Sequence, residues 1–357
     1  MNELDLLIET ALRSRATDLH ICENAAPRVR IDGAICEMKA VPAYATPETL
    51  ARQIFSRLPP KVSEKLEGIF AKGGDIDCAI TGVMGIRARA NIYRSQSGQQ
   101  IALRLLPSQI FSAEQIGVPF VAMELCKSKS GIFIVAGANG TGKTTTLASM
   151  IEIINNSKRS HVLTIENPVE YIFKSKMSLI SQREVGLHAP DFYTALRSSL
   201  RENPDVVMLG EMRDLETART ALELAETGIL VLATLHTKTA PSTIDRLVGQ
   251  FPSNEQPQIR YMLAESLLGV LSQTLVEKKN GGLVAAFEFL KSTDAVKNII
   301  REQKNHQLID VIQTSRNLGM CTMEDSLLSL VQKGIIDSNE ALAKAYRPAE
   351  MKKYLGQ

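Results

Sequence analysis

Hydrophobic and polar positions along the first hundred residues predict a mixed unit of helices and strands. Residues 2 to 14 carry apolar side chains at helical spacing. Thr46 followed by Pro47 is typical of a helix start, because threonine caps free N–H groups and proline suits the first helical position. Alternating runs predict half-buried strands at residues 18 to 22, 28 to 32, 86 to 93 and 100 to 105.

A different pattern begins at residue 131, where short apolar runs alternate with helical segments up to residue 235. Uninterrupted apolar strands separated by helices predict a parallel sheet that is covered on both faces. Beyond Pro241 the pattern becomes mostly helical, and we expect a helix over 259 to 275 and a strand at 284 to 290.

The segment from residue 107 to 119 separates the two patterns. It has prolines at both ends, Gly117 within it and no clear periodicity, which is typical of a linker. The sequence therefore predicts an α+β domain at residues 1–106, a linker at 107–119, and an α/β nucleotide-binding domain with a helical C-terminal region at 120–357.

The strongest chemical signal is a G-x-x-x-x-G-K-T run that follows the apolar strand at 132 to 136 and opens a helix. In such a P-loop, backbone N–H groups surround the phosphates of a nucleotide, Lys143 reaches the β and γ phosphates, and the Thr144 hydroxyl can bind magnesium. The residues expected to bind ATP are Gly137, Asn139, Gly140, Thr141, Gly142, Lys143, Thr144 and Thr145.

Three further candidates end predicted strands of the same sheet. Glu211 follows the strand at 205 to 209 and is the natural acid for the magnesium ion, beside Thr144. Glu166 ends the strand at 161 to 165, where it could polarise the attacking water or be a solvated turn carboxylate. His236 ends the strand at 229 to 235 and could bind a phosphate, although a single histidine is more often a structural hydrogen-bonder.

Three arginines lie on predicted strands of the first domain: Arg87, Arg89 and Arg104. Spacing of two residues places Arg87 and Arg89 on one face of their strand. Surface arginines are common, so residue type alone favours a solvated face over a phosphate contact.

The composition is that of a folded protein, since 44% of the 357 residues are hydrophobic and 22% are charged. A net charge of +2 gives no general attraction to nucleic acid, so a P-loop protein acting on DNA is disfavoured. The five cysteines are scattered without a CxxC pair, which argues against disulfides and structural zinc. No apolar run approaches the roughly 20 residues that span a bilayer. We expect a cytoplasmic protein.

Several segments in order resemble the secretion ATPase superfamily of type II secretion and type IV pili, from about residue 15 to residue 335. Within it the chain is most similar to the PilT-type pilus retraction ATPases. The segments are ATDLHI, RVRIDG, RARANIY, GANGTGKTTTLASMIEIIN, LTIENPVEY, ISQREVG, ALRSSLRENPDVVMLGEMRDLETARTALELAETG, LATLHT, IDRLVGQFP and VKNIIREQKNHQLIDVIQTSRNLGMCTMEDSLLSLVQKGII.

The resemblance implies a hexameric ring in which ATP binds between a PAS-like N-terminal domain and a RecA-like ATPase domain. Lys143 and Thr144 match the Walker A motif, and Glu211 matches the Walker B glutamate. Glu166 matches the catalytic glutamate of the Asp box, and His236 matches the second histidine of the His box. In the family, arginines of the first domain interact with the nucleotide phosphates, and these match Arg87, Arg89 and Arg104.

The implied function is that of a Mg²⁺-dependent ATPase that removes pilin subunits during pilus retraction, at the inner membrane through the pilus machinery. Expected partners are further copies of the chain, an inner-membrane platform protein and a paralogous pilus ATPase. A pilus extension or type II secretion ATPase is the alternative, but its extra N-terminal domain and tetracysteine insertion are not found here.

Two positions depart from the family pattern. Asn167 stands where the Asp box has aspartate, and Ile229 stands where the His box opens with histidine. These departures leave open an accessory ATPase that binds nucleotide with weak turnover.

Overall fold

The computed structural model describes residues 2–31, 33–38, 46–82, 85–106 and 109–356. It divides into two compact units, Met1–Gln109 with Pro168–Ile172, and Ile110–Asn167 with Phe173–Gln357. Asp32, at the end of a predicted strand, and Pro107, at the start of the predicted linker, lie outside the described residues. The rest of the predicted linker contains a short capped helix, α4 (Ala113–Ile116).

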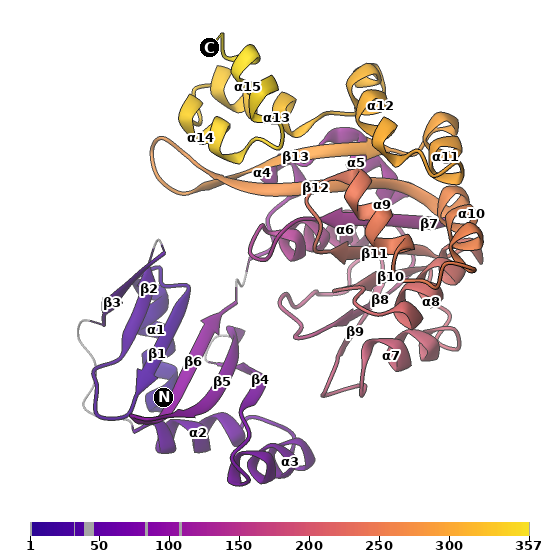
Figure 1. Cartoon of the computed structure of the whole chain (residues 1–357). Coiled ribbons are helices and arrows are strands. Elements are labelled where there is room, and N and C mark those ends of the chain that lie inside the picture. The colour runs from indigo at the N-terminus through magenta and orange to yellow at the C-terminus, as the bar shows by residue number, and fades with distance from the viewer. Residues whose placement is uncertain (1, 32, 39–45, 83–84, 107–108, 357) are drawn as a thin grey trace. The chain divides into compact units, whose positions relative to one another are not determined.

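In its described residues, the first unit is a six-stranded antiparallel sheet in the order β3-β2-β1-β6-β5-β4, with three α-helices (Figure 1). Its elements are α1 (Glu3–Arg13), β1 (Asp18–Cys22), β2 (Arg28–Ile31), β3 (Ala34–Glu37), α2 (Pro47–Phe55), α3 (Pro60–Ala71), β4 (Ile76–Thr81), β5 (Arg87–Ser95) and β6 (Gly98–Leu105). The sequence pattern did not single out β3, α3 or β4.

Helices α1 and α2 cover one face of this sheet. Thr46 caps α2 as expected, accepting a hydrogen bond from the backbone N–H of Thr49. Leu7 of α1 and Ile54 of α2 join a buried cluster with the inward residues of β1, β5 and β6. The alternating burial along β5 leaves its polar side chains on the other face.

The second unit is built on a seven-stranded sheet in the order β13-β12-β7-β11-β10-β8-β9, parallel except for β13 (Figure 1). The strands are β7 (Gly131–Ala136), β8 (His161–Glu166), β9 (Leu179–Glu184), β10 (Val206–Leu209), β11 (Leu230–Leu235), β12 (Leu267–Glu277) and β13 (Leu283–Lys291). Every residue of β7, β10 and β11 is buried, as the unbroken apolar runs predicted.

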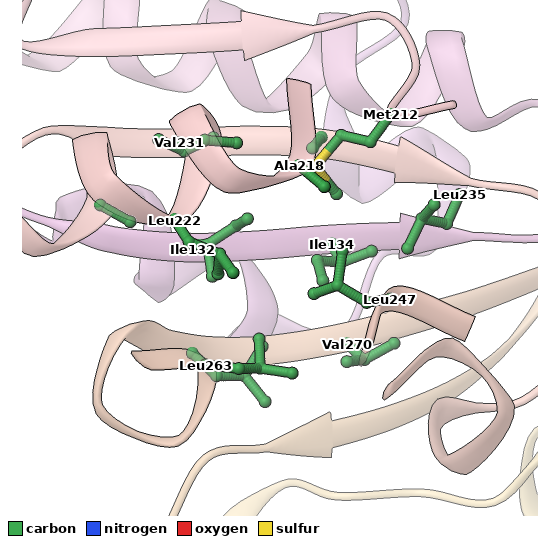
Figure 2. Packing of buried hydrophobic residues seen from close by; sticks show 14 of the residues in the cluster. Ile132, Ile134, Met212, Ala218, Leu222, Val231, Leu235, Leu247, Leu263 and Val270 are labelled. Atoms are coloured by element: carbon green, nitrogen blue, oxygen red, sulfur yellow. The ribbon is translucent and has the colours of Figure 1, made fainter. Parts of the chain in front are cut away.

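Helices cover both faces of this sheet. After α4, the helical elements are α5 (Phe120–Glu124), η2 (Leu125–Lys127), α6 (Lys143–Ser157), α7 (Phe192–Ser199), α8 (Leu215–Glu226), α9 (Ala240–Val248), α10 (Gln256–Ser266), α11 (Asp294–Arg301), η3 (Asn305–Gln307), α12 (Leu308–Thr314), η4 (Arg316–Leu318), α13 (Met323–Gln332), α14 (Ser338–Lys344) and α15 (Pro348–Tyr354). On one face, Ile132 and Ile134 of β7 pack with Leu222 of α8 and Leu263 of α10 (Figure 2). Helix α6 packs against β7 and β11.

The helix predicted over 259 to 275 is wrong in its second half. Helix α10 ends at Ser266, and β12 starts at Leu267 and pairs in parallel with β7. A continuous apolar run fits a buried strand as well as a buried helix, and here the pairing with β7 decides. The misassigned strand lies directly beside the strand that carries the P-loop.

Helices α13, α14 and α15 form a separate apolar cluster on the extended ends of β12 and β13, with Val276, Met323 and Leu327 buried at its centre. In the part of the chain that the structure describes, no helix has the length and apolar character needed to cross a membrane.

Candidate nucleotide-binding site

The predicted P-loop connects β7 to α6, which begins at Lys143. Gly142 precedes the helix in the left-handed conformation, with φ of 86°. At Gly137, φ is 156°, and an added Cβ would lie 2.5 Å from Thr141 Oγ1 and 2.6 Å from the backbone oxygen of Gln273. Only glycine therefore lets the loop turn this tightly against β12.

The ammonium group of Lys143 is folded back over its own loop. Its Nζ donates to the carbonyl oxygens of Gly137 at 2.9 Å and Ala138 at 2.8 Å, and lies 3.2 Å from Nδ1 of His236. Only 7% of Lys143 is exposed. A buried positive charge at a helix N-terminus makes this loop suited to phosphate.

His236 links Lys143 to Glu211, because its Nε2 lies 2.8 Å from Oε1 of Glu211. Desolvation lowers the pKa of His236, the nearby Lys143 charge lowers it further, and both outweigh the opposing effect of Glu211. The neutral ring satisfies both contacts when Nε2–H donates to Glu211 and Nδ1 accepts from Lys143. Arg213 Nε also contacts Glu211 Oε1, at 2.6 Å.

Glu166 ends β8 and is 2% exposed, so it is not a solvated turn carboxylate. Its Oε1 accepts a hydrogen bond from the Thr164 hydroxyl at 2.7 Å and one from Gln182 Nε2 at 3.4 Å. Gly210 follows β10 directly beside it, since a Cβ added there would lie 3.4 Å from Glu166 Cα. A buried carboxylate held at the carboxyl edge of a parallel sheet is well placed for proton transfer.

The other predicted loop residues differ in exposure. Asn139 and Gly140 are exposed, whereas Thr144 and Thr145 are half-buried in the first turn of α6. The Thr144 hydroxyl and the Glu211 carboxylate are oxygen donors, which suit Mg²⁺ when water and phosphate oxygens complete its shell. Among the described residues no cluster of three or more His, Cys, Asp or Glu side chains could hold a metal without such help.

The three arginines belong to the other unit and lie on the polar face of its sheet. Arg89 and Arg104 are directly opposite each other on β5 and β6. Arg89 forms an ion pair with Asp77, and Arg104 Nε lies 3.0 Å from Asp18 Oδ1. Arg87 is half-buried on the same face of β5 as Arg89. Each of the two pairs holds an arginine to a carboxylate of its own sheet.

Two side chains that support the P-loop and Glu166 from neighbouring strands have no motif in the sequence. Gln273 of β12 contacts Thr141 in the loop and Thr146 in α6. Gln182 of β9 contacts Glu166. Gln273 stands out as a glutamine inside an apolar run, but this run predicts a helix and therefore gives no link to the P-loop.

A P-loop between β7 and α6, with acids at the carboxyl ends of β8 and β10 of one parallel sheet, defines a P-loop nucleoside triphosphatase. Residues 1–281 match the family described as type II/IV secretion system protein. The chain belongs to this family of ATPases, and within it the chain is similar to PilT over almost its whole length.

Relatives match over almost the whole chain. The uncharacterized protein YggR of Escherichia coli (strain K12) is 43% identical over 331 residues, which cover 93% of this chain and 99% of that protein. The type IV pilus retractation ATPase PilT of Pseudomonas aeruginosa is 40% identical over 343 residues, covering 96% and 98%. A crystal structure of the pilus retraction motor PilT with bound ADP superposes with a TM-score of 0.88 at 42% identity, covering 99% of each chain.

Proposed function

We propose that this chain hydrolyses ATP with Mg²⁺ and uses the energy, as a hexameric ring, to retract type IV pili. The observation that carries the proposal is the chain of contacts from Lys143 through His236 to Glu211 beside the P-loop. Relatives of nearly the same length are named as pilus retraction ATPases, which supports retraction of the pilus over its extension.

In this proposal the loop N–H groups and Lys143 bind the β and γ phosphates and stabilise the charge that develops on the transferred phosphoryl group. The neutral His236 holds the Glu211 carboxylate and the Lys143 ammonium in place. When Mg²⁺ is bound with the nucleotide by Thr144 and Glu211, it neutralises charge on the phosphate oxygens.

Glu166 is the proposed general base. It accepts a proton from water as the water oxygen forms a bond to the γ phosphorus and the bond from that phosphorus to the bridging oxygen breaks. The products are ADP and inorganic phosphate. Thr164 and Gln182 keep the carboxylate oriented, so little reorganisation is needed during the reaction.

Beyond the nucleotide site, we propose a homo-oligomeric ring at the cytoplasmic face of the inner membrane, held there by a pilus platform protein. A paralogous pilus ATPase is a further expected partner. Light scattering with ATP and Mg²⁺ at micromolar protein tests the ring, and a species that stays monomeric would contradict it.

The deciding experiment for function has two parts. Purified protein should release phosphate from ATP in a Mg²⁺-dependent manner, and cells that lack the protein should keep or gain pili while losing retraction. Cells without pili would instead identify an extension ATPase.

A nucleotide-gated accessory protein with weak turnover is the second candidate, and one observation bears on it. Asn167 is exposed directly after Glu166, at the carboxyl edge of the sheet. Ile229 precedes β11 and therefore lies at the opposite end of the strand from His236. Of the two departures from the family pattern, we therefore expect only Asn167 to weaken hydrolysis.

A further inference from the structure

A buried glutamine lies directly behind the P-loop. Strand β12 pairs with β7 up to Ser272, which is opposite Ala136. The next residue, Gln273, therefore lies beside the start of the loop, and only 2% of it is exposed. A buried side-chain amide needs hydrogen-bond partners, because leaving one unsatisfied is costly.

Both ends of the Gln273 amide have such partners. Nε2 donates to the carbonyl oxygen of Thr141, inside the loop, at 2.7 Å. Oε1 accepts from the hydroxyl of Thr146, in the first turns of α6, at 2.6 Å. The Thr141 carbonyl fixes which end of the amide faces the loop, since a carbonyl oxygen can only accept and a reversed amide would lose this contact. The Thr146 hydroxyl then donates to the other end.

The carbonyl that Gln273 holds belongs to the peptide joining Thr141 to Gly142. In a planar trans peptide the C=O and the N–H point in opposite directions. Anchoring the Thr141 oxygen on the β12 side therefore turns the Gly142 N–H away from β12. Because Gly142 has φ of 86°, this peptide lies in a stretch where glycine lets the backbone rotate easily.

We propose that Gln273 is a positioning residue for nucleotide binding: it holds the Thr141–Gly142 peptide so that the Gly142 N–H faces the phosphates, and the Thr146 hydroxyl anchors the oxygen end of its amide. The proposal rests on the assignment of the P-loop as the nucleotide site. Gln273 acts through the loop and does not touch the nucleotide.

Affinity for ADP in the presence of Mg²⁺, measured by calorimetry on the full chain, tests the proposal. Gln273→Leu keeps the bulk and removes both hydrogen bonds, and we expect ADP to bind about tenfold more weakly, as for the loss of one hydrogen bond to a charged group. Thr146→Val should weaken ADP binding to a smaller extent. Thr146→Ser retains the hydroxyl and should bind ADP nearly as tightly as the wild type.

Thr220→Val is the matched control. Thr220 is 6% exposed on α8, and its hydroxyl bonds to the carbonyl of Glu216 at 2.9 Å, so this change removes a buried hydroxyl away from the loop. We expect ADP affinity to be unchanged in this variant.

Wild-type ADP affinity in folded Gln273→Leu would overturn the proposal and leave the P-loop assignment intact. If Gln273→Leu does not fold, the Thr146 variants decide, since equal losses for Thr146→Ser and Thr146→Val would overturn the role of the hydroxyl. Wild-type protein that fails to bind ADP would overturn the nucleotide site and this proposal together.

Discussion

The two units hold their charged side chains in different ways. On the N-terminal sheet, Arg104 is paired with Asp18, and 68% of the Arg104 side chain is exposed. On the sheet of the second unit, Lys143 and Glu166 are buried and bonded to backbone carbonyls or neighbouring side chains. One region is a solvated charged face, and the other is a set of desolvated groups in fixed positions.

The difference indicates which charges can change partners at low cost. Exposed ion pairs contribute about 0 to 1 kcal/mol, so Arg104 can leave Asp18 for another anion with little loss of stability. Partial burial tends to raise the pKa of Asp18, but hydrogen bonds from Thr17 and Arg104 outweigh it and lower the pKa. Buried charges cannot move in this way, and their fixed geometry suits electrostatic stabilisation of a reaction.

The largest expected effect comes from a buried charge, Lys143 in the P-loop. Lys143→Ala removes the only positive charge that we assign to the inside of the loop, and we expect ATP hydrolysis to fall by about a thousandfold or more. Steady-state phosphate release measures it. Turnover equal to that of the wild type would show that the active site has been misassigned.

Glu166→Gln should slow hydrolysis by about a hundredfold while ADP affinity stays near that of the wild type, because the change removes a base but no phosphate contact. Single-turnover hydrolysis and calorimetry separate the two quantities. Loss of ADP binding would instead give Glu166 a structural role.

Glu288 tests how burial changes the pKa of a carboxylate away from the nucleotide site. It is 1% exposed on β13, and its Oε1 accepts the backbone N–H of Ala240 at 2.8 Å. Burial raises its pKa from 4.5 to about 7. Between pH 4.5 and about pH 7, the folded chain keeps a proton on Glu288 that the unfolded chain releases. The stability that this protonation contributes is complete below pH 4.5 and is lost as the pH rises through about 7.

Glu288→Gln abolishes this titration and can still accept the Ala240 N–H. The wild type loses this contribution between pH 4 and pH 8 and the variant does not. We therefore expect the difference in unfolding free energy, variant minus wild type, to rise by about 3 kcal/mol from pH 4 to pH 8. Urea unfolding at both values of pH measures the gain. Glu277→Gln, at the exposed end of β12, is the control, and an equal gain there would contradict the role of burial.

On the exposed side of the comparison, Arg104→Ala should lower hydrolysis severalfold without a detectable change in thermal unfolding. Arg30→Ala is a matched control, because Arg30 lies 3.7 Å from the same Asp18 and is not a candidate. Equal kinetics for the wild type and both variants would return Arg104 to the role of a solvated surface residue.

The smallest expected effect concerns the departures from the family pattern. Asn167→Asp restores the aspartate next to Glu166, and we expect turnover to rise about two- to threefold, the effect of a charge at the exposed edge of the site. Ile229→His restores the other residue at the far end of β11 and should leave turnover unchanged. The reverse result would favour a role for Ile229.

Features that depend on local chemistry could be predicted from the order of residues alone. The spacing of Gly137, Gly142 and Lys143 predicted a phosphate-binding loop, because these residues act through the backbone next to them. The fully apolar runs of β7, β10 and β11 predicted a buried parallel sheet, because both faces of such strands are covered. Their places at strand ends made Glu166, Glu211 and His236 candidates, and their roles stay predictions.

Which residues meet across the chain depends on how the strands pair in three dimensions. The sequence left open whether Glu166 is solvated, and burial beside Thr164 and Gln182 answers this. It also assigned a helix where β12 pairs with β7, so Gln273 could not be connected to the P-loop. Apolar runs show that a segment is buried, but the order of strands in the sheet determines which buried polar side chain reaches which loop.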